Sequence, residues 1–153
     1  MKKLSIVIFA VVVLVVVYWL SSPLFIDRKV GEKLEEITSV GEGAPSVVVE
    51  GMFVGADDFH KANGAMKVLK TGEKYFVRLE DNFMVTNGPD LFVYFGKNGA
   101  YDPNAQIAAL KGNIGGQNYE VPVNLNPLDY NEVWIWCRVF VVPFGRAEMR
   151  FVL

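Results

Sequence analysis

The sequence predicts an all-β domain, an antiparallel β-sandwich or flattened barrel, preceded by one N-terminal transmembrane helix. Short β-rich runs with a two-residue period follow one another from residue 46 onward, and turn residues separate them without long helical patterns. An uncharged apolar run over Leu4–Leu20 predicts the helix. The chain has 153 residues, 52% of them hydrophobic and 21% charged, which allows one globular domain and excludes a disordered chain.

The apolar run follows Lys2 and Lys3, carries Tyr18 and Trp19 near its far end, and stays uncharged to Ile26. At 1.5 Å per residue it spans about 25–34 Å, enough for a hydrocarbon core of roughly 30 Å. A cleaved signal peptide is the alternative, but its apolar region is only about 7–15 residues long and ends in a small-residue site. We therefore expect a signal anchor in membrane lipid over residues 4–26, with residues 1–3 in the cytoplasm.

Basic residues flank the apolar run on both sides, so their count does not decide its orientation. Because a very short basic N-terminus usually stays inside, we expect an extracytoplasmic C-terminal domain, at the cell surface or on the periplasmic side. Residues 27–45 are expected to form a juxtamembrane linker. Within it, Val30, Leu34 and Ile37 at helical spacing predict a short helix, and residues 46–153 are expected to form the β-domain.

Nine runs predict the strands: Ser46–Val54, Ala65–Lys70, Lys74–Glu80, Phe83–Thr86, Leu91–Phe95, Gln106–Lys111, Tyr119–Val123, Glu132–Val142 and Ala147–Val152. Thr71-Gly72 predicts a tight hairpin between two of them, and Asn87–Asp90 predicts a turn. Alternation predicts one wet face for Lys74–Glu80. Glu132–Val142 is apolar on both faces, so we expect one central strand covered on both sides.

One cysteine and one histidine limit the chemistry of the chain. They exclude an internal disulfide, a Cys/His zinc site, a cysteine-ligated iron–sulfur cluster and a blue-copper site, all of which need more such ligands. A formal charge of −2 indicates that nucleic acid is not a partner. No calcium-loop spacing appears among the aspartates, so no metal site is predicted.

Cys137 lies in mid-strand between Trp136 and Arg138. It is either a small buried hydrophobic residue or a redox thiol or axial haem ligand. His60 follows Asp57 and Asp58 in a loop, where it either ligates a metal or haem, acts as a base, or only forms surface hydrogen bonds. No C-x-x-C-H motif occurs, which excludes covalent c-type haem.

Trp134, Trp136 and Phe140 form an aromatic stripe, which indicates either packing or contact with a flat hydrophobic ligand or a partner protein. GNIGG (112–116) has the wrong spacing for a dinucleotide fingerprint, and no helix follows it. It is expected to be a hairpin loop.

Three segments together resemble the DM-thirteen domain, the small all-β electron-transfer domain found in the Skeletor protein and alongside DOMON domains. They are GMFVGADDFHKANGAMKVLKTGEKYFVRLEDNFMVTNGPDLFVYF, LKGNIGGQNYEVP and VWIWCRVFVVPFGRAEM. The resemblance covers roughly residues 47–153, and the motifs NGPDL, GNIG-x-QNY and WC-R occur in order. SPLFID (22–27) is similar to the juxtamembrane stretch of single-pass members.

The resemblance implies a β-sandwich-like domain outside the cytoplasm that takes part in electron transfer through a cysteine. That cysteine acts as a bare thiol or binds a group such as haem, and the role maps onto Cys137, with the family histidine at His60. The chain lacks a DOMON domain, so a redox partner protein is expected. The first hypothesis is a membrane-anchored electron carrier in which Cys137, His60 and Trp136 hold a cofactor. The alternative is a non-catalytic binding module at the cell surface.

Overall fold

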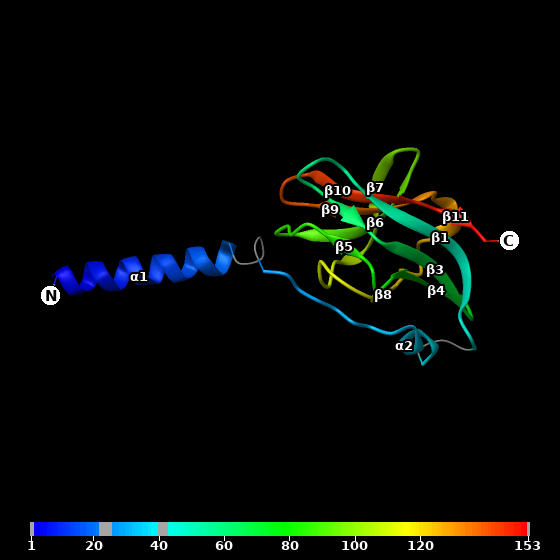
Figure 1. Cartoon of the computed structure of the whole chain (residues 1–153), viewed down its shortest axis with the longest axis horizontal. Coiled ribbons are helices and arrows are strands. Elements are labelled where there is room, and N and C mark those ends of the chain that lie inside the picture. Colours follow the sequence, from blue (N-terminus) through cyan, green and yellow to red (C-terminus); the bar gives the residue numbers. More distant parts are fainter. Residues whose placement is uncertain (1, 22–25, 40–42, 153) are drawn as a thin grey trace.

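The computed structural model describes residues 2–21, 26–39 and 43–152 (Figure 1). Two α-helices, α1 (Lys2–Ser21) and α2 (Leu34–Thr38), precede the β-domain. Its strands are β1 (Ser46–Gly55), β2 (Ala62–Asn63), β3 (Ala65–Thr71), β4 (Lys74–Leu79), β5 (Met84–Val85), β6 (Leu91–Lys97), β7 (Ala100–Ala109), β8 (Gln117–Glu120), β9 (Glu132–Cys137), β10 (Val142–Glu148) and β11 (Arg150–Phe151). The all-β prediction is confirmed.

Nine strands form one sheet in the order β7-β6-β9-β10-β1-β3-β4-β8, with β11 paired to β1, and every pairing is antiparallel. The sheet curls into a half-barrel (Figure 1). Its inner face holds the core, in which Phe83, Phe95 and Ile135 are fully buried. The predicted Thr71-Gly72 hairpin is confirmed, since Thr71 pairs with Lys74 across it.

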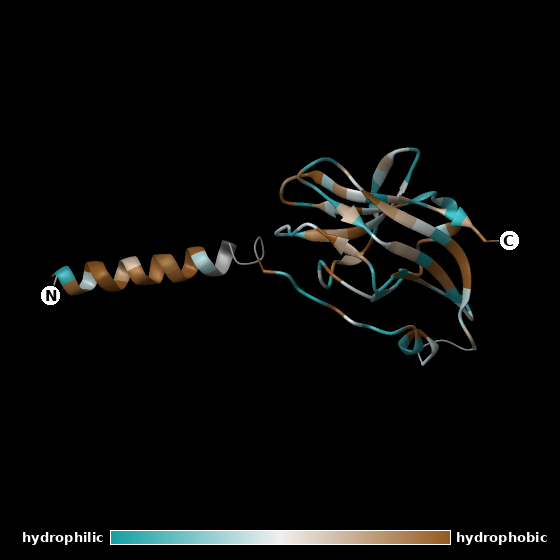
Figure 2. Ribbon diagram, in the orientation of Figure 1, coloured by the Kyte–Doolittle hydropathy of each residue, from teal (hydrophilic) through white to brown (hydrophobic). Residues whose placement is uncertain are grey.

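α1 occupies most of the predicted membrane anchor over residues 4–26, and its described apolar side chains are exposed. Figure 2 shows that hydrophobic residues make up most of its length. Residues 22–25 of that prediction lie outside the described residues. Among the helices of the described ranges, none meets the length and hydropathy required to cross a membrane. α1 forms where the apolar run predicts a helix. Its insertion in a membrane stays a prediction.

The segment 27–33, predicted as part of a linker with a helical start, is extended and pairs with the β7–β8 loop. Val30 N–H donates to the Ile114 carbonyl at 2.9 Å, and Glu32 N–H donates to the Gly116 carbonyl at 3.0 Å. The helical spacing of Val30 was therefore misleading, because backbone pairing with the loop replaces the first helical turn. Only Leu34–Thr38 is helical.

The segment that follows covers the outer face of β4, so the prediction of a wet face there is wrong. Ile37 of α2 packs on Leu69 and Phe76 in a second apolar cluster. Arg78, on the same face, is buried and donates to the Glu32 carbonyl at 3.0 Å. The alternation predicts the two faces of β4 correctly, but it does not show that another part of the chain covers the polar face.

Glycines in the β7–β8 loop allow this docking, which predicts a strong effect of Gly115→Ala. Gly115 has φ +95°, and a Cβ there would collide with the Val30 carbonyl oxygen. The left-handed conformation alone costs a residue with a side chain about 1–2 kcal/mol. We expect amide hydrogen exchange at Val30 and Glu32 to rise about tenfold or more. Gly31→Ala is the matched control, because its Cβ would meet nothing within 4 Å. Equal exchange in both variants would contradict the docking.

The predicted single strand Glu132–Val142 is wrong, because the chain turns back within it. β9 ends at Cys137, Arg138–Val141 forms a turn, and β10 begins at Val142, which pairs with Cys137. No Gly, Pro or Asn marks this turn, and Val141 adopts φ 56° in it. β7 also starts earlier than predicted, at Ala100, because Pro103 is tolerated in an edge strand.

Candidate functional site

Cys137 lies on the inner face of β9 as its last residue, beside the β9–β10 turn, and not in mid-strand as predicted. Its register partners are Leu91 on β6 and Val142 on β10. The side chain is 0% exposed and belongs to the apolar core. Four surface grooves of the described chain are lined by other residues.

These surroundings do not fit a haem at Cys137. A haem needs an open cavity beside its axial ligand, whereas packed apolar side chains enclose this sulfur. The described residues also contain no group of three or more His, Cys, Asp or Glu side chains that could hold a metal ion. A redox role of Cys137 stays a prediction, limited to one that needs no direct contact with solvent or a bound group.

His60 lies in the loop after β1, at the end of the sheet where β9 and β10 turn. Its Nδ1 lies 2.7 Å from the Asp57 carboxylate, and its ring packs on Phe144 with centroids 4.5 Å apart. Its backbone N–H also donates to Asp57 at 2.7 Å. Trp136 points to the opposite, outer face of β9, since neighbouring strand residues alternate. The three residues predicted to hold a cofactor therefore do not share one pocket.

The contact between His60 and Asp57 predicts a measurable acid titration. Hydrogen bonds from the His60 ring and backbone hold the pKa of Asp57 at about 2, below its ordinary value of 3.8. Because this pKa is depressed, the contact is intact above about pH 4 and is lost as the pH falls through about 2. We expect the side-chain carboxyl resonance of Asp57 to titrate with a midpoint near 2. A midpoint near 3.8 would show that the loop contact does not form in solution.

The outer face of β6, β7 and β9 carries a continuous group of aromatic side chains, here called the aromatic row. Tyr101 stacks on Trp136 with ring centroids 3.8 Å apart and an interplanar angle of 20°. Trp134 lies 6.5 Å from Trp136, and Tyr94 lies 5.3 Å from Tyr101, both edge-on. The sequence predicts a stripe of Trp134, Trp136 and Phe140, but Phe140 lies in the β9–β10 turn and is not part of the row. The prediction missed the tyrosines, because only the strand pairing brings β6 and β7 beside β9.

Trp134 is the more buried tryptophan and has a polar partner. Its indole Nε1–H donates to the carboxylate of Glu132 at 3.0 Å. Glu132 is itself buried and accepts from Arg146 at 3.0 Å and from the Gly99 N–H. Gly96 is required beneath this side chain, because a Cβ there would collide with the indole of Trp134.

Arg138, the first residue after β9, joins two of the sequence motifs. Its guanidinium donates to both oxygens of Asp90, at 3.0 and 3.4 Å, and its backbone N–H donates to the Asp90 carbonyl at 3.1 Å. The same guanidinium lies 3.6 Å from the centroid of Phe92. The NGPDL and WC-R motifs therefore meet at one end of the sheet, on the face opposite Cys137.

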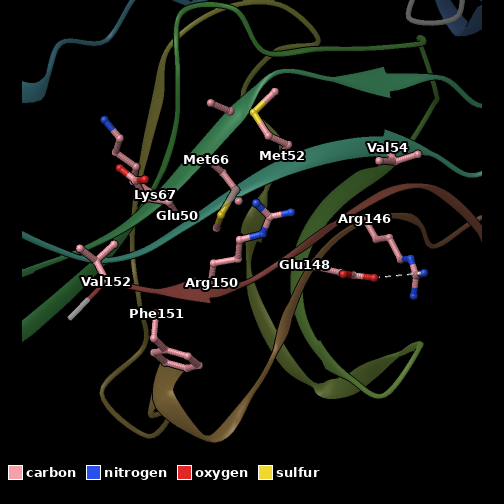
Figure 3. Close-up of a pocket in the computed structure, with 12 residues that line it drawn as sticks. Glu50, Met52, Val54, Met66, Lys67, Arg146, Glu148, Arg150, Phe151 and Val152 are labelled. Atoms are coloured by element: carbon pink, nitrogen blue, oxygen red, sulfur yellow. Dashed lines mark ion pairs between the residues drawn. The ribbon is translucent and has the colours of Figure 1, made fainter.

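A groove of about 590 Å³ runs along β1 between β3 and the C-terminal strands (Figure 3). Apolar Met52, Val54 and Phe151 line it together with charged Lys67 and Arg150. It contains none of the site residues predicted from the sequence, and no sequence motif indicated it, because its two walls are distant in the chain.

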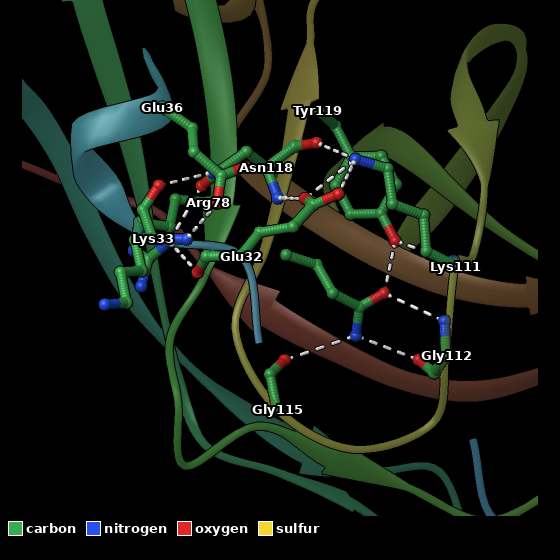
Figure 4. A network of polar contacts seen from close by, with 10 residues as sticks. Glu32, Lys33, Glu36, Arg78, Lys111, Gly112, Gly115, Asn118 and Tyr119 are labelled. Atoms are coloured by element: carbon green, nitrogen blue, oxygen red, sulfur yellow. Dashed lines mark hydrogen bonds and ion pairs between the residues drawn. The ribbon is translucent and has the colours of Figure 1, made fainter. Parts of the chain in front are cut away.

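A polar network fastens the N-terminal segment to the β-domain (Figure 4). Glu32 accepts from Lys111 Nζ at 2.8 Å and from the Asn118 N–H at 2.7 Å. Burial raises the pKa of Glu32, but the hydrogen bonds from Lys111 and Asn118 outweigh it and hold the pKa below its ordinary 4.5. The network surrounds the GNIG-x-QNY motif, whose polar residues thus serve the fold.

The fold and the outer face together define a small antiparallel β-domain with a buried thiol and a surface row of tryptophans and tyrosines. Residues 53–149, more than half of the chain, match the family described as "Electron transfer DM13". The chain belongs to this family, as the resemblance predicted. No curated protein and no solved structure matches it significantly.

Proposed function

We propose that this protein is a membrane-anchored, extracytoplasmic electron-transfer module in which the aromatic row carries the electron. The observation that supports this most is the stack of Tyr101 on Trp136, with centroids 3.8 Å apart, in a chain of an electron-transfer family. Tryptophan and tyrosine are among the side chains most readily oxidised by one electron, and close aromatic contact favours transfer between them. The fully buried Cys137 is assigned a packing role on the inner face.

The electron moves in balanced steps. A one-electron oxidant on a redox partner protein takes an electron from Trp136, leaving a radical cation. Trp134 supplies an electron to Trp136 and loses its indole proton to Glu132, which lies 3.0 Å from Nε1. A one-electron donor then restores Trp134, and the proton returns. Tyr94 keeps its proton during these steps. Burial raises the pKa of its hydroxyl, and the group that accepts its hydrogen bond is the weakly basic amide oxygen of Gln106.

The experiment is photo-oxidation of the folded protein by a ruthenium(III) complex, in a Trp19→Phe background that leaves only the tryptophans of the row. We expect Trp136→Phe to slow reduction of the oxidant toward the rate of the Trp134→Phe/Trp136→Phe double variant. Cys137→Ala, the control on the inner face, should leave the rate unchanged. A rate that drops in Cys137→Ala but not in Trp136→Phe would overturn the proposed route.

The anchor is supported by α1, a 20-residue helix whose described residues beyond Lys3 are uncharged and whose apolar side chains are exposed. We expect the full chain to float with lipid vesicles after an alkaline wash, and a C-terminal reporter to be active only outside the cytoplasm. Recovery of the chain in the washed supernatant would contradict the anchor.

The alternative is a non-catalytic binding module, which the groove along β1 supports (Figure 3). Met52 and Val54, 58% and 67% exposed, give this groove an apolar wall. Two results together would favour this function over electron transfer. The protein would donate no electron to the oxidant, and it would bind a cell-surface partner whose binding is lost in Met52→Asp.

A further inference from the structure

We propose that the β-domain rests directly on the bilayer that holds α1, with two apolar loop tips inserted in the lipid interface. The tips are Phe59 and the β9–β10 turn, Val139–Val141, here called the apolar tips. This inference depends on the anchor in the proposed function and adds a second contact with the same membrane.

The apolar tips are far more exposed than is usual for such side chains. Phe59 is 86% exposed, and Val139, Phe140 and Val141 are 62%, 59% and 65% exposed. Three consecutive exposed apolar residues in a turn form a patch that water solvates poorly, and such patches mark contact surfaces. Val141 also keeps φ 56°, which is unfavourable for a β-branched residue.

Strand pairing places both tips at one end of the half-barrel. The loop that carries Phe59 follows Gly55, whose register partner is Gly145, and the β9–β10 turn immediately precedes β10. The Ala56 N–H donates to the Phe144 carbonyl, so the loop continues along the start of β10. Both tips therefore extend past the same edge of the sheet.

The N-terminal segment enters the β-domain at this same end. Asp27 accepts from the side chains of Asn87 and Asn113, at 3.0 and 2.9 Å. Asn87 lies three residues before Asp90, the partner of Arg138 beside the β9–β10 turn. In Figure 1 the start of this segment and the β9–β10 turn lie at the same end of the domain.

The length of the chain keeps this end close to the membrane. Five residues separate Ser21, the end of α1, from Asp27, so the two Cα atoms are at most about 20 Å apart when the chain is fully extended. The hydrogen bonds of Glu32 with Lys111 and Asn118 hold the segment on the domain, so the end of the domain at Asp27 stays within this distance of the end of α1. The bilayer interface is thus the apolar environment within reach of the tips.

The charges around the tips favour apolar rather than electrostatic contact. Asp57 and Asp58 precede Phe59, and Arg138 beside the β9–β10 turn is neutralised by Asp90. This end therefore has no strong excess of positive charge with which to attract anionic lipids. Insertion into zwitterionic vesicles is expected, with little dependence on salt.

The test places a spin label on the full-length chain in phosphatidylcholine vesicles, in a Cys137→Ala background. Phe140→Cys reports the tip, and Val123→Cys is the matched control. Val123 is a 99% exposed apolar residue, and the loop that carries it lies at the opposite end of the sheet, next to Tyr75. We expect the label at 140 to collide more with oxygen than with a water-soluble nickel chelate, and the label at 123 to show the reverse.

A label at 140 with the same water-like accessibility as the label at 123, on protein that floats with the vesicles, would overturn the inference and leave the anchor intact. Protein that fails to float would overturn the anchor and this inference together. A separate variant labelled at Phe59→Cys controls for disturbance of the β9–β10 turn by the label at 140. It is expected to give the same lipid-like result.

Discussion

Cys137 in the folded protein is expected to react with a small disulfide reagent at least about 10³-fold more slowly than in the urea-unfolded chain. The sulfur is 0% exposed and packed in the core, so reaction requires the β9 region to open. A domain stable by about 5 kcal/mol or more populates open core states at only about one part in 10³–10⁴. The measurement is the absorbance of released thiolate with and without urea.

Val123→Cys is the control, because its thiol would lie on the surface and should react within the mixing period. The double variant Cys137→Ala/Val123→Cys gives the reaction rate of the thiol at position 123 alone. Rapid stoichiometric labelling of Cys137 in native protein would show an accessible thiol. It would restore the hypothesis in which this residue meets a cofactor or redox partner directly.

Gln117→Leu is expected to destabilise the β-domain by about 3–5 kcal/mol, because it leaves several buried polar groups without hydrogen-bond partners. The side chain is 0% exposed. Its Oε1 accepts from the Gly112 N–H at 3.0 Å and from the Tyr119 hydroxyl at 2.6 Å, and its Nε2 donates to the Gly112 carbonyl at 2.9 Å. These bonds close the GNIGG loop on which the N-terminal segment lies. Urea unfolding followed by tryptophan fluorescence measures the loss.

Gln106→Leu is the matched control, since it makes the same substitution on an exposed strand position. The Gln106 side chain accepts a hydrogen bond from the Tyr94 hydroxyl at 2.9 Å, so a loss of about 1 kcal/mol or less is expected. Equal destabilisation by the two substitutions would contradict the assigned role of Gln117. Unfolding should also release the N-terminal segment in Gln117→Leu at lower urea than in the parent protein.

Local patterns were enough to predict the strands and much of the core. The two-residue period located β1, β3, β4 and β6 within a few residues, and it assigned Val77 and Leu79 to the inner face, where both are buried. The Thr71-Gly72 pair predicts the tight hairpin, because glycine is typical of such turns. These features depend only on neighbours in the sequence, so a single chain could reveal them.

Features that depend on pairing between distant segments could not be predicted. The β9–β10 turn is made of apolar residues, so it looked like continuous strand. Tyr94 and Tyr101 join Trp136 only because β6 and β7 lie beside β9 in the sheet. Arg78 is buried because residues 30–38 cover it, which no alternation pattern reports. Cys137 was correctly placed on an apolar face, but its complete enclosure depends on the curl of the whole sheet.

Electron transfer along the outer aromatic row is tested most directly by identifying the radical left after one-electron photo-oxidation. The measurement is electron paramagnetic resonance of flash-oxidised, rapidly frozen protein in the Trp19→Phe background, with ring-deuterated tryptophan as the reporter. We predict a neutral tryptophanyl radical whose hyperfine structure changes on deuteration, and a shift toward the radical cation in Glu132→Gln. A sulfur-centred radical that disappears in Cys137→Ala would contradict this and place the redox centre inside the sheet.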